Sequence, residues 1–227
     1  SRLTSEKLVQ ELKKIGLEKV KGRIVDTGFA PQVSKEWIER LLQRPVKSFK
    51  QAIEKIPASF VSGQGRALEE AKSILFEKRK GLEVDEIAAI HLYTHECLYR
   101  KLNSVLRGNN EKEREPFLDF TRLLLYALKK LPNEPSSVFY RVVNCKLGDD
   151  YGNGKSFFWS AFSSCSTDGD QAMGFATKRK PHTMFIITGC GKSIAEFSNF
   201  EAENEVLLPI STEFRVENKF TAGKMTV

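Results

Sequence analysis

The sequence predicts an α+β fold with a helical N-terminal half and a mainly antiparallel, two-sheet β core in the C-terminal half. Over roughly the first 130 of the 227 residues, apolar side chains recur every three to four positions, which is the period of an amphipathic helix. After Leu131-Pro132 the chain changes to short runs rich in Val, Ile, Phe and Trp, separated by Gly, Asn, Asp or Pro. These runs leave little room for crossover helices, so helices and strands are expected to be segregated.

Four segments of the N-terminal half have helical periodicity. They cover residues 4–15, 34–43, 84–106 and 115–130. The first two begin at Thr4 and Ser34, whose hydroxyl groups can cap the free N–H groups of a first turn. The third segment is long, and we expect it to break into two helices near Thr94.

Six runs of the C-terminal half have the composition of strands. They are SSVFYRVVNCKL (136–147), SFFWSAFSS (156–164), HTMFIITG (182–189), KSIAEFS (192–198), NEVLLPI (204–210) and EFRVE (213–217). The C-terminal stretch 219–227 alternates around a Gly turn and predicts a last strand. No internal repeat interrupts this order.

The composition is that of a globular protein. Hydrophobic residues make up 41% and charged residues 29% of the chain, which excludes a disordered or a membrane-spanning class. No run approaches the roughly 20 apolar residues that a membrane helix needs. The first residues contain neither an apolar segment nor a small-residue cleavage site, so we expect no signal peptide, and we interpret the chain as a domain of a longer protein.

The chain carries a formal net charge of +7, with basic clusters at residues 78–80 and 178–180. Such clusters fit anionic partners such as phosphates, nucleic acid or an acidic protein surface, and the alternative is a solvated basic face. The four cysteines form no Cys-x-x-Cys pair, and the three histidines lack metal-ligand spacing with them, so no metal site is expected. Cys97 lies in a predicted helix and Cys165 near a predicted site, which favours reduced thiols and an intracellular setting.

Three stretches of the strand-rich half carry polar residues where a purely structural strand would not. Arg141 stands within Phe139–Val143, either at a strand end or directed into a cleft to bind phosphate. Ser164 and Ser166 follow an aromatic strand and could instead begin a turn. Glu203 and Glu205 precede an apolar strand, either as an acidic turn or on one face awaiting a cationic substrate.

In this order the three stretches resemble the Arg-Ser-Glu signature of the ADP-ribosyltransferases related to cholera toxin and to the vertebrate arginine-specific enzymes. Further segments are similar to the helix before the core and to the C-terminal strands of that family: Val84–Thr94 with Tyr99 and Leu102-Asn103, then Thr183–Phe185, Gly191–Ile194 and Phe214–Val216. The resemblance covers residues 63–227, which we interpret as the ADP-ribosyltransferase domain. Residues 1–62 are then a helical N-terminal extension.

The resemblance implies that the chain transfers ADP-ribose from NAD, its substrate, to arginine side chains of acceptor proteins, without a metal. Glu205 would stabilise the oxocarbenium-like state of the ribose, and Ser164 would hold that carboxylate in place. Arg141 would pair with phosphate through its fork of donors. Glu203 would orient the acceptor guanidinium and take its proton, because a guanidinium is too basic to lose one unaided.

Other residues receive roles from the same resemblance. Tyr140, Ser166 and Phe175 are expected at the NAD site together with Arg141 and Ser164, and Phe200 in acceptor recognition. Trp159 and Phe175 are candidates for the nicotinamide side, with packing in the core as the alternative.

Two positions depart from the family pattern. Val142 follows the signature arginine where Gly is frequent, and this affects how closely the backbone approaches nicotinamide. Cys165 stands between the two serines where Thr or Ser is more usual. Neither departure removes a group with a direct chemical role.

Three other functions fit parts of the sequence. An NAD glycohydrolase would need the same Arg141, Ser164 and Glu205. A non-catalytic basic module would bind nucleic acid or an acidic protein, although a decayed enzyme would be expected to lose one of these three residues. A transferase acting on a nucleobase would suit the positive charge, whereas Glu203 favours a guanidinium acceptor.

Overall fold

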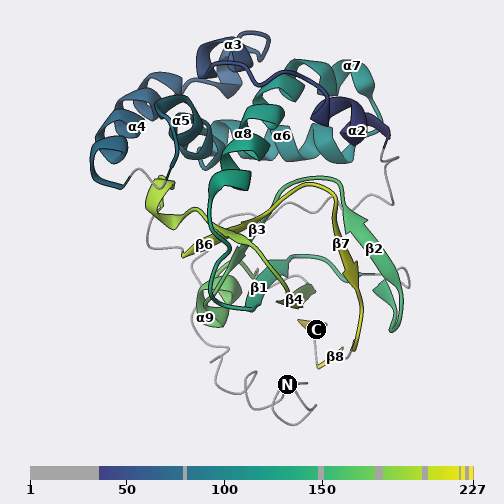
Figure 1. Ribbon diagram of the computed structural model, residues 1–227. Coiled ribbons are helices and arrows are strands. Elements are labelled where there is room, and N and C mark those ends of the chain that lie inside the picture. Colours follow the sequence, from purple (N-terminus) through teal and green to yellow (C-terminus); the bar gives the residue numbers. More distant parts are fainter. Residues whose placement is uncertain are drawn as a thin grey trace.

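The computed structural model describes residues 36–78, 81–147, 151–176, 181–200, 204–219, 221–222 and 225–226. Helices of the N-terminal half form a layer across one end of the β core (Figure 1), which confirms the predicted α+β class. Several sequence predictions lie outside the described residues, namely the helix at 4–15, the cap at Ser34, basic residues 79–80 and 178–180, and Glu203. Among the described helices, none has the length and apolar character to cross a membrane.

The helical layer contains most of the predicted helices. It comprises α2 Glu36–Leu42, α3 Phe49–Ile53, α4 Gln64–Lys78, α5 Val84–Tyr93, α6 Glu96–Arg107, α7 Glu111–Arg114 and α8 Leu118–Lys130, with 3-10 turns η1 Ala58–Phe60 and η2 Glu115–Phe117. The predicted break near Thr94 is present between α5 and α6. The helices α3, α4 and α7 were not predicted from the sequence. Helices α3 and α7 have only 5 and 4 residues and are too short to show a period, whereas the 15-residue α4 was missed.

Helix α5 is the centre of the hydrophobic core. Every residue from Glu86 to Tyr93 is buried, so this helix is enclosed on all sides instead of having one solvated face. The same core contains Phe49 of α3 and reaches Phe162 and Phe197 of the strand-rich half. The helical layer and one end of the β core therefore share one apolar interior, and the division of the chain after residue 62 stays a prediction.

The strands form a seven-stranded sheet in the order β5-β6-β3-β1-β4-β9-β8 and a two-stranded sheet of β2 and β7. Their bounds are β1 Val138–Val143, β2 Ser156–Trp159, β3 Ser163–Ser166, β4 His182–Thr188, β5 Lys192–Ser193, β6 Glu205–Leu208, β7 Thr212–Arg215, β8 Thr221–Ala222 and β9 Met225–Thr226. Only β4 and β9 pair in parallel among the described strands, which confirms a mainly antiparallel, two-sheet core.

Two predicted strand runs differ from the structure. The run 156–164 is divided between β2 and β3, which belong to different sheets. Trp159 ends β2 in an aromatic cluster with Phe157 and Phe214, whereas Ala161 and Phe162 turn into the core of the helical layer. The run 192–198 is a strand only at Lys192–Ser193 and continues as the 3-10 turn η4 Ala195–Phe197.

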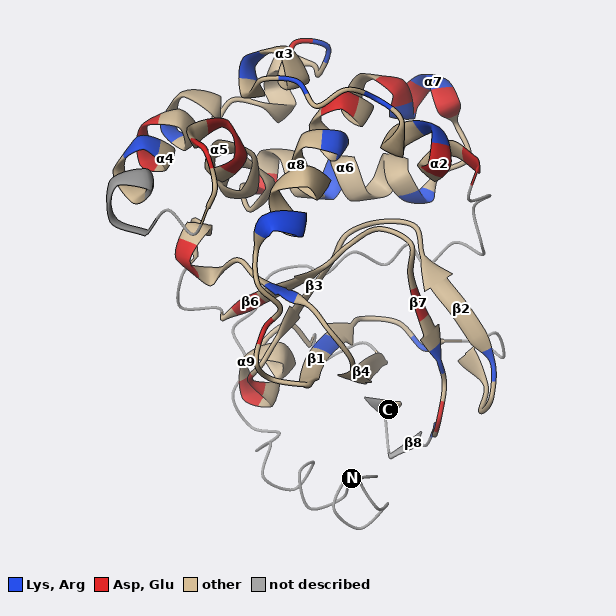
Figure 2. Cartoon of the chain, viewed as in Figure 1, with Lys and Arg blue, Asp and Glu red and all other residues tan. Residues whose placement is uncertain are grey.

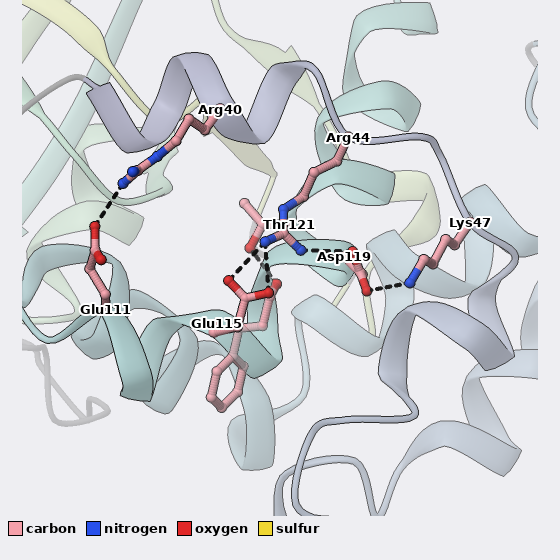
Figure 3. A network of polar contacts seen from close by, with 8 residues as sticks. Arg40, Arg44, Lys47, Glu111, Glu115, Asp119 and Thr121 are labelled. Carbon is pink, nitrogen blue, oxygen red and sulfur yellow. Dashed lines mark hydrogen bonds and ion pairs between the residues drawn. The ribbon is translucent and has the colours of Figure 1, made fainter.

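An ion-pair network fastens the segment after α2 to η2 and α8 (Figure 3). Arg44 donates from Nη2 to the two carboxylate oxygens of Glu115 at 2.7 and 2.8 Å, and from Nη1 to Asp119 Oδ1 at 3.2 Å. Lys47 Nζ donates to Asp119 Oδ2 at 2.7 Å. Asp119 is buried, and although burial alone would raise its pKa, the hydrogen bonds from Lys47 and Arg44 outweigh burial and hold the pKa below its usual value.

We predict that Asp119→Asn lowers the free energy of unfolding at neutral pH by about 2 kcal/mol, because it removes the carboxylate that pairs with Lys47 and one of the two carboxylates that pair with Arg44. A carboxyl whose folded pKa is lowered stabilises the protein above its unfolded pKa near 4, and loses this effect as the pH falls through the folded value. Urea unfolding should therefore show a difference at pH 7 that shrinks below about pH 4. The control is Glu111→Gln, whose exposed partner Arg40 lies 2.7 Å away, and which should change little. An equal effect of both substitutions would contradict the prediction.

Candidate active site

The predicted site residues that are described lie around one cleft between the helical layer and the seven-stranded sheet. They are Tyr140, Arg141, Ser164, Ser166, Phe175, Phe200 and Glu205. The cleft encloses roughly 910 Å³, including its open mouth, which is within the usual range for small-molecule sites. In Figure 2 most blue and red ribbon lies on the helices, while the strands around the cleft are mainly tan.

The sheet register brings three of these residues into one row. Tyr140 of β1 pairs with Ser166 of β3, and Ser166 pairs with Glu205 of β6. Directly opposite residues on antiparallel strands share a face, and residues two apart on one strand do too. Ser164, Ser166, Glu205 and Tyr140 therefore face the same side, and Glu205 is buried there with 8% of its surface exposed.

Arg141 lies where β1 and β3 separate. The two strands share one paired position, and beyond it Arg141 Nη1 donates to the carbonyl oxygen of Ser164 at 2.6 Å. The guanidinium also lies over the Trp159 ring, 5.5 Å from its centre. Its Nε is buried and has no hydrogen-bond partner among the described residues. Arg141 thus completes the sheet with one nitrogen and retains donors that a ligand in the cleft can use.

A second guanidinium, which the sequence did not predict, lines the same cleft. Arg107 stands at the end of α6. Burial and the nearby charge of Arg141 lower its pKa to about 10. Two guanidiniums this close repel each other, and an anion between them would remove that repulsion. Guanidinium pairs are suited to bidentate contacts with phosphate oxygens.

Helices α5 and α6 add a polar group next to the serines. The phenol of Tyr93 accepts a hydrogen bond from Asn103 Nδ2 at 3.1 Å and lies within hydrogen-bonding contact of the Ser164 side chain. Burial raises the pKa of Tyr93, and the nearby Glu205 carboxylate raises it further, so the phenol keeps its proton. With Asn103 as donor, the Tyr93 hydroxyl is available to donate towards Ser164.

The turn after β3 has a well-defined support. Ser166 Oγ donates to Gln171 Oε1 at 3.2 Å and accepts from Asp168 N at 3.0 Å. Asp168 caps α9 Gly169–Met173 by accepting from two backbone N–H groups. Phe175 follows this helix, and its carbonyl accepts from Asn144 Nδ2 at 2.9 Å. The hydroxyl of Ser166 therefore holds the turn that carries Phe175 to the cleft.

Two other positions named from the sequence pack mainly in the interior, although Val142 also lines the cleft. Trp159 packs edge to face with Phe185 and against Phe214 between the two sheets, which agrees with the packing alternative for this residue. Val142 is buried under α9 with Ala172 and Met173. Its side chain is therefore accommodated in the core, although Gly is frequent at this position in the family that the sequence resembles.

The residues on α5 and α6 left a signal in the sequence. Tyr99, Asn103 and Arg107 follow one another at intervals of four residues and all line the cleft. Residues four apart lie on one face of a helix, and here this face is directed at the cleft. The described residues contain no group of three or more His, Cys, Asp or Glu able to hold a metal ion.

Comparison with known proteins identifies relatives of this arrangement. The sequence model of the family NAD:arginine ADP-ribosyltransferase matches residues 34–227. The search of curated proteins gave no match. Among solved structures, the eukaryotic mono-ADP-ribosyltransferase ART2.2 is similar with 21% identity and a TM-score of 0.64, over 85% of this chain and 82% of that chain.

Other similar structures carry relevant ligands. A variant of ART2.2 in complex with NAD has 19% identity and a TM-score of 0.63, over 85% of this chain and 83% of that chain. The ADP-ribosyltransferase Vis from Vibrio splendidus, in complex with agmatine, has 20% identity and a TM-score of 0.57. That match covers 82% of this chain and 86% of the other. At these identities the structures establish a shared fold.

We predict that Cys165, which lines the cleft but is 5% exposed, resists alkylation in the folded protein. Burial raises the pKa of its thiol to about 12, and the thiolate is the reactive form. Iodoacetamide at pH 8 followed by peptide mass spectrometry should find the exposed Cys190 modified and Cys165 unmodified, with both modified in denaturant. Modification of Cys165 as fast as Cys190 would show that the thiol is accessible.

Proposed function

This chain belongs to the NAD:arginine ADP-ribosyltransferase family, and we propose that it transfers ADP-ribose from NAD to arginine side chains of acceptor proteins, releasing nicotinamide. The observation that carries the proposal is the row of Ser164, Ser166 and Glu205 facing a cleft with two guanidiniums. NAD supplies the complementary groups, since its pyrophosphate is an anion and its ribose becomes cationic as the glycosidic bond breaks.

The pyrophosphate is assigned to Arg141 and Arg107. Arg141 donates one hydrogen bond from Nη1 to the Ser164 carbonyl at 2.6 Å. The other N–H groups of Arg141 and the guanidinium of Arg107 are suited to phosphate oxygens. Burial and the charge of Arg141 lower the pKa of Arg107, and an anion bound by both guanidiniums relieves the repulsion between them.

Glu205 is assigned to the ribose. The bond between the anomeric carbon and the nicotinamide nitrogen breaks, and nicotinamide leaves with the bonding pair. The ribose is then an oxocarbenium-like cation, which a carboxylate in a partly buried site stabilises more strongly than in water. Ser164 holds this carboxylate, and the Tyr93 phenol, fixed by Asn103, orients the Ser164 hydroxyl.

The acceptor is assigned to Glu203 and Phe200. One guanidinium nitrogen attacks the anomeric carbon and forms the new C–N bond, and Glu203 takes the proton released from that nitrogen. Phe200, which stands three residues before Glu203 in the sequence, lines the cleft. The agmatine complex of the similar Vis enzyme, whose ligand carries a guanidinium, supports this acceptor class.

The second candidate is an NAD glycohydrolase, because Arg141, Ser164 and Glu205 would also serve transfer to water. Incubation with NAD in the presence and absence of agmatine separates the two functions. ADP-ribosylated agmatine, detected by mass spectrometry, supports the transferase, whereas free ADP-ribose as the sole product at every agmatine concentration supports the glycohydrolase.

We predict that Glu205→Gln abolishes both transfer and NAD hydrolysis. The substitution removes the charge that faces the developing cation, and losses from such electrostatic groups are typically about 100-fold to 1,000-fold. Nicotinamide release measured by chromatography reports both reactions. Hydrolysis near the wild-type rate in a folded variant would refute the role of Glu205.

We predict that Glu203→Gln suppresses transfer to agmatine while NAD hydrolysis stays measurable. Water needs no strong base to trap an oxocarbenium ion, whereas a guanidinium must be oriented and deprotonated, and a general base contributes about 100-fold to 10,000-fold. The ratio of ADP-ribosylated agmatine to free ADP-ribose is the measurement. Equal loss of both products would assign Glu203 to the NAD site or the fold, and an unchanged ratio would disprove its role at the acceptor.

A further inference from the structure

The segment from Ile194 to Phe200, which contains η4, is fixed at its beginning. Ile194 N donates to the carbonyl of Glu205 at 3.0 Å, so the segment starts beside β6. Phe197 at the end of η4 is 1% exposed and belongs to the core of the helical layer. Phe200 follows three residues later and lines the cleft. The backbone conformation of Ser198 and Asn199 therefore determines the position of the Phe200 ring.

The last turn of α5 binds this segment through two side chains. His91 Nδ1 lies 3.1 Å from the carbonyl oxygen of Phe197. Thr94 Oγ1 accepts from the N–H of Asn199 at 2.9 Å and donates to the carbonyl of His91 at 2.8 Å. His91 and Thr94 are 4% and 5% exposed, so water does not compete for these bonds.

A third bond completes the arrangement. Ser198, 6% exposed, accepts at Oγ from the N–H of Phe200 at 3.0 Å. The carbonyl or amide groups of Phe197, Asn199 and Phe200 are thus each held by a buried polar side chain, one from α5 and one from the residue that caps it.

We propose that His91 and Thr94 are positioning residues for the acceptor: they hold the backbone of residues 197–199 and so place Phe200 at the guanidinium side of the cleft. The inference rests on the proposed transfer to arginine. Neither role requires contact with the reacting atoms, and His91 does not line the cleft.

The hydrogen-bond direction defines what His91 must supply. The Phe197 carbonyl is an acceptor, so Nδ1 carries the proton, and in the neutral ring Nε2 carries none. Nε2 is buried and has no hydrogen-bond partner among the described residues. His95, whose ring centre is 5.2 Å away, and Arg66 and Glu70 of α4 are the titratable groups facing it. Burial lowers the pKa of His91, which keeps the neutral, Nδ1-protonated form in place.

The strand that carries Glu205 has supports of its own, besides its bond to Ile194. Glu205 is paired with Ser166 in the sheet, and its strand continues through pairs of β6 with β3 and β5. Loss of the His91 bond should therefore move Phe200 while Glu205 keeps its place. Transfer to agmatine should therefore be impaired more than NAD hydrolysis, because only transfer needs the acceptor side of the cleft.

The test compares His91→Leu, which removes the donor, with His91→Asn, whose side-chain N–H can take the place of Nδ1–H. We expect His91→Leu to raise the KM for agmatine by about 10-fold or more, since small misplacements of a binding group cost this much. The KM for NAD and the kcat of hydrolysis without agmatine should change by less than about 2-fold, and His91→Asn should recover most of the loss. An unchanged KM for agmatine, or equal loss of transfer and hydrolysis in folded His91→Leu, would overturn the inference.

Ser198→Ala provides a second variant if His91→Leu does not fold. It removes the acceptor for the Phe200 N–H and should likewise raise the KM for agmatine without a matching change in hydrolysis. The matched control is Thr121→Val in α8, whose buried hydroxyl donates to the Phe117 carbonyl at 2.8 Å, away from the cleft. This control should lower the melting temperature and leave the KM for agmatine unchanged. Failure of the proposed function itself shows in the wild-type protein, as absence of agmatine modification, and failure of the positioning role shows only in the variants.

Discussion

The cleft depends on the separation of β1 and β3 after one paired position. The pairing of Tyr140 with Ser166 starts the row that ends at Glu205, and beyond this pair no residue of β1 is in register with Ser164. Arg141 fills this place from its side chain. A buried carbonyl that loses its partner costs roughly 1–3 kcal/mol, so the arginine stabilises the opened sheet that also presents it to a ligand. The same side chain, Arg141, therefore serves both the stability of the sheet and the proposed binding of the ligand.

Helix α5 connects this part of the sheet to the helical half of the chain. It is buried along its length from Glu86, and its last turn brings Tyr93 next to Ser164 and His91 next to the Phe197 carbonyl. The same turn therefore contacts Ser164, which shares the cleft with Glu205, and the backbone that leads to Phe200. The helices are accordingly part of the site. The shared core that includes Phe49 fixes their position relative to the sheet.

Much of this arrangement was predictable because it is local in sequence. Period and composition indicated α2, the α5–α6 pair and α8, and polar residues at strand ends indicated Arg141, Ser164 and Glu205. The contribution of Tyr93 was not predicted, because it depends on packing between segments far apart in the chain, and the spacing of Arg107 with Asn103 and Tyr99 was not recognised. The division of residues 156–164 between two sheets was also missed, since Phe and Trp favour strands on both sides of the turn, and only the burial of Phe162 among helices decides where the chain leaves the first sheet.

The proposed function depends on the few charged side chains in the cleft and not on the net charge of the chain. The chain carries +7 overall, yet most charged ribbon lies on the helices and the strands at the cleft are largely uncharged (Figure 2). Within these mainly uncharged walls stand two guanidiniums, Arg141 and Arg107, and the buried carboxylate of Glu205. Charges in such surroundings interact more strongly than exposed ones, which solvent and salt screen. Under the proposed function, the cleft combines a cationic part for a diphosphate with an anionic part for a developing cation. A generally basic surface would bind any polyanion, whereas this pairing of opposite charges selects a molecule that becomes positive next to its own phosphates, as NAD does when nicotinamide leaves.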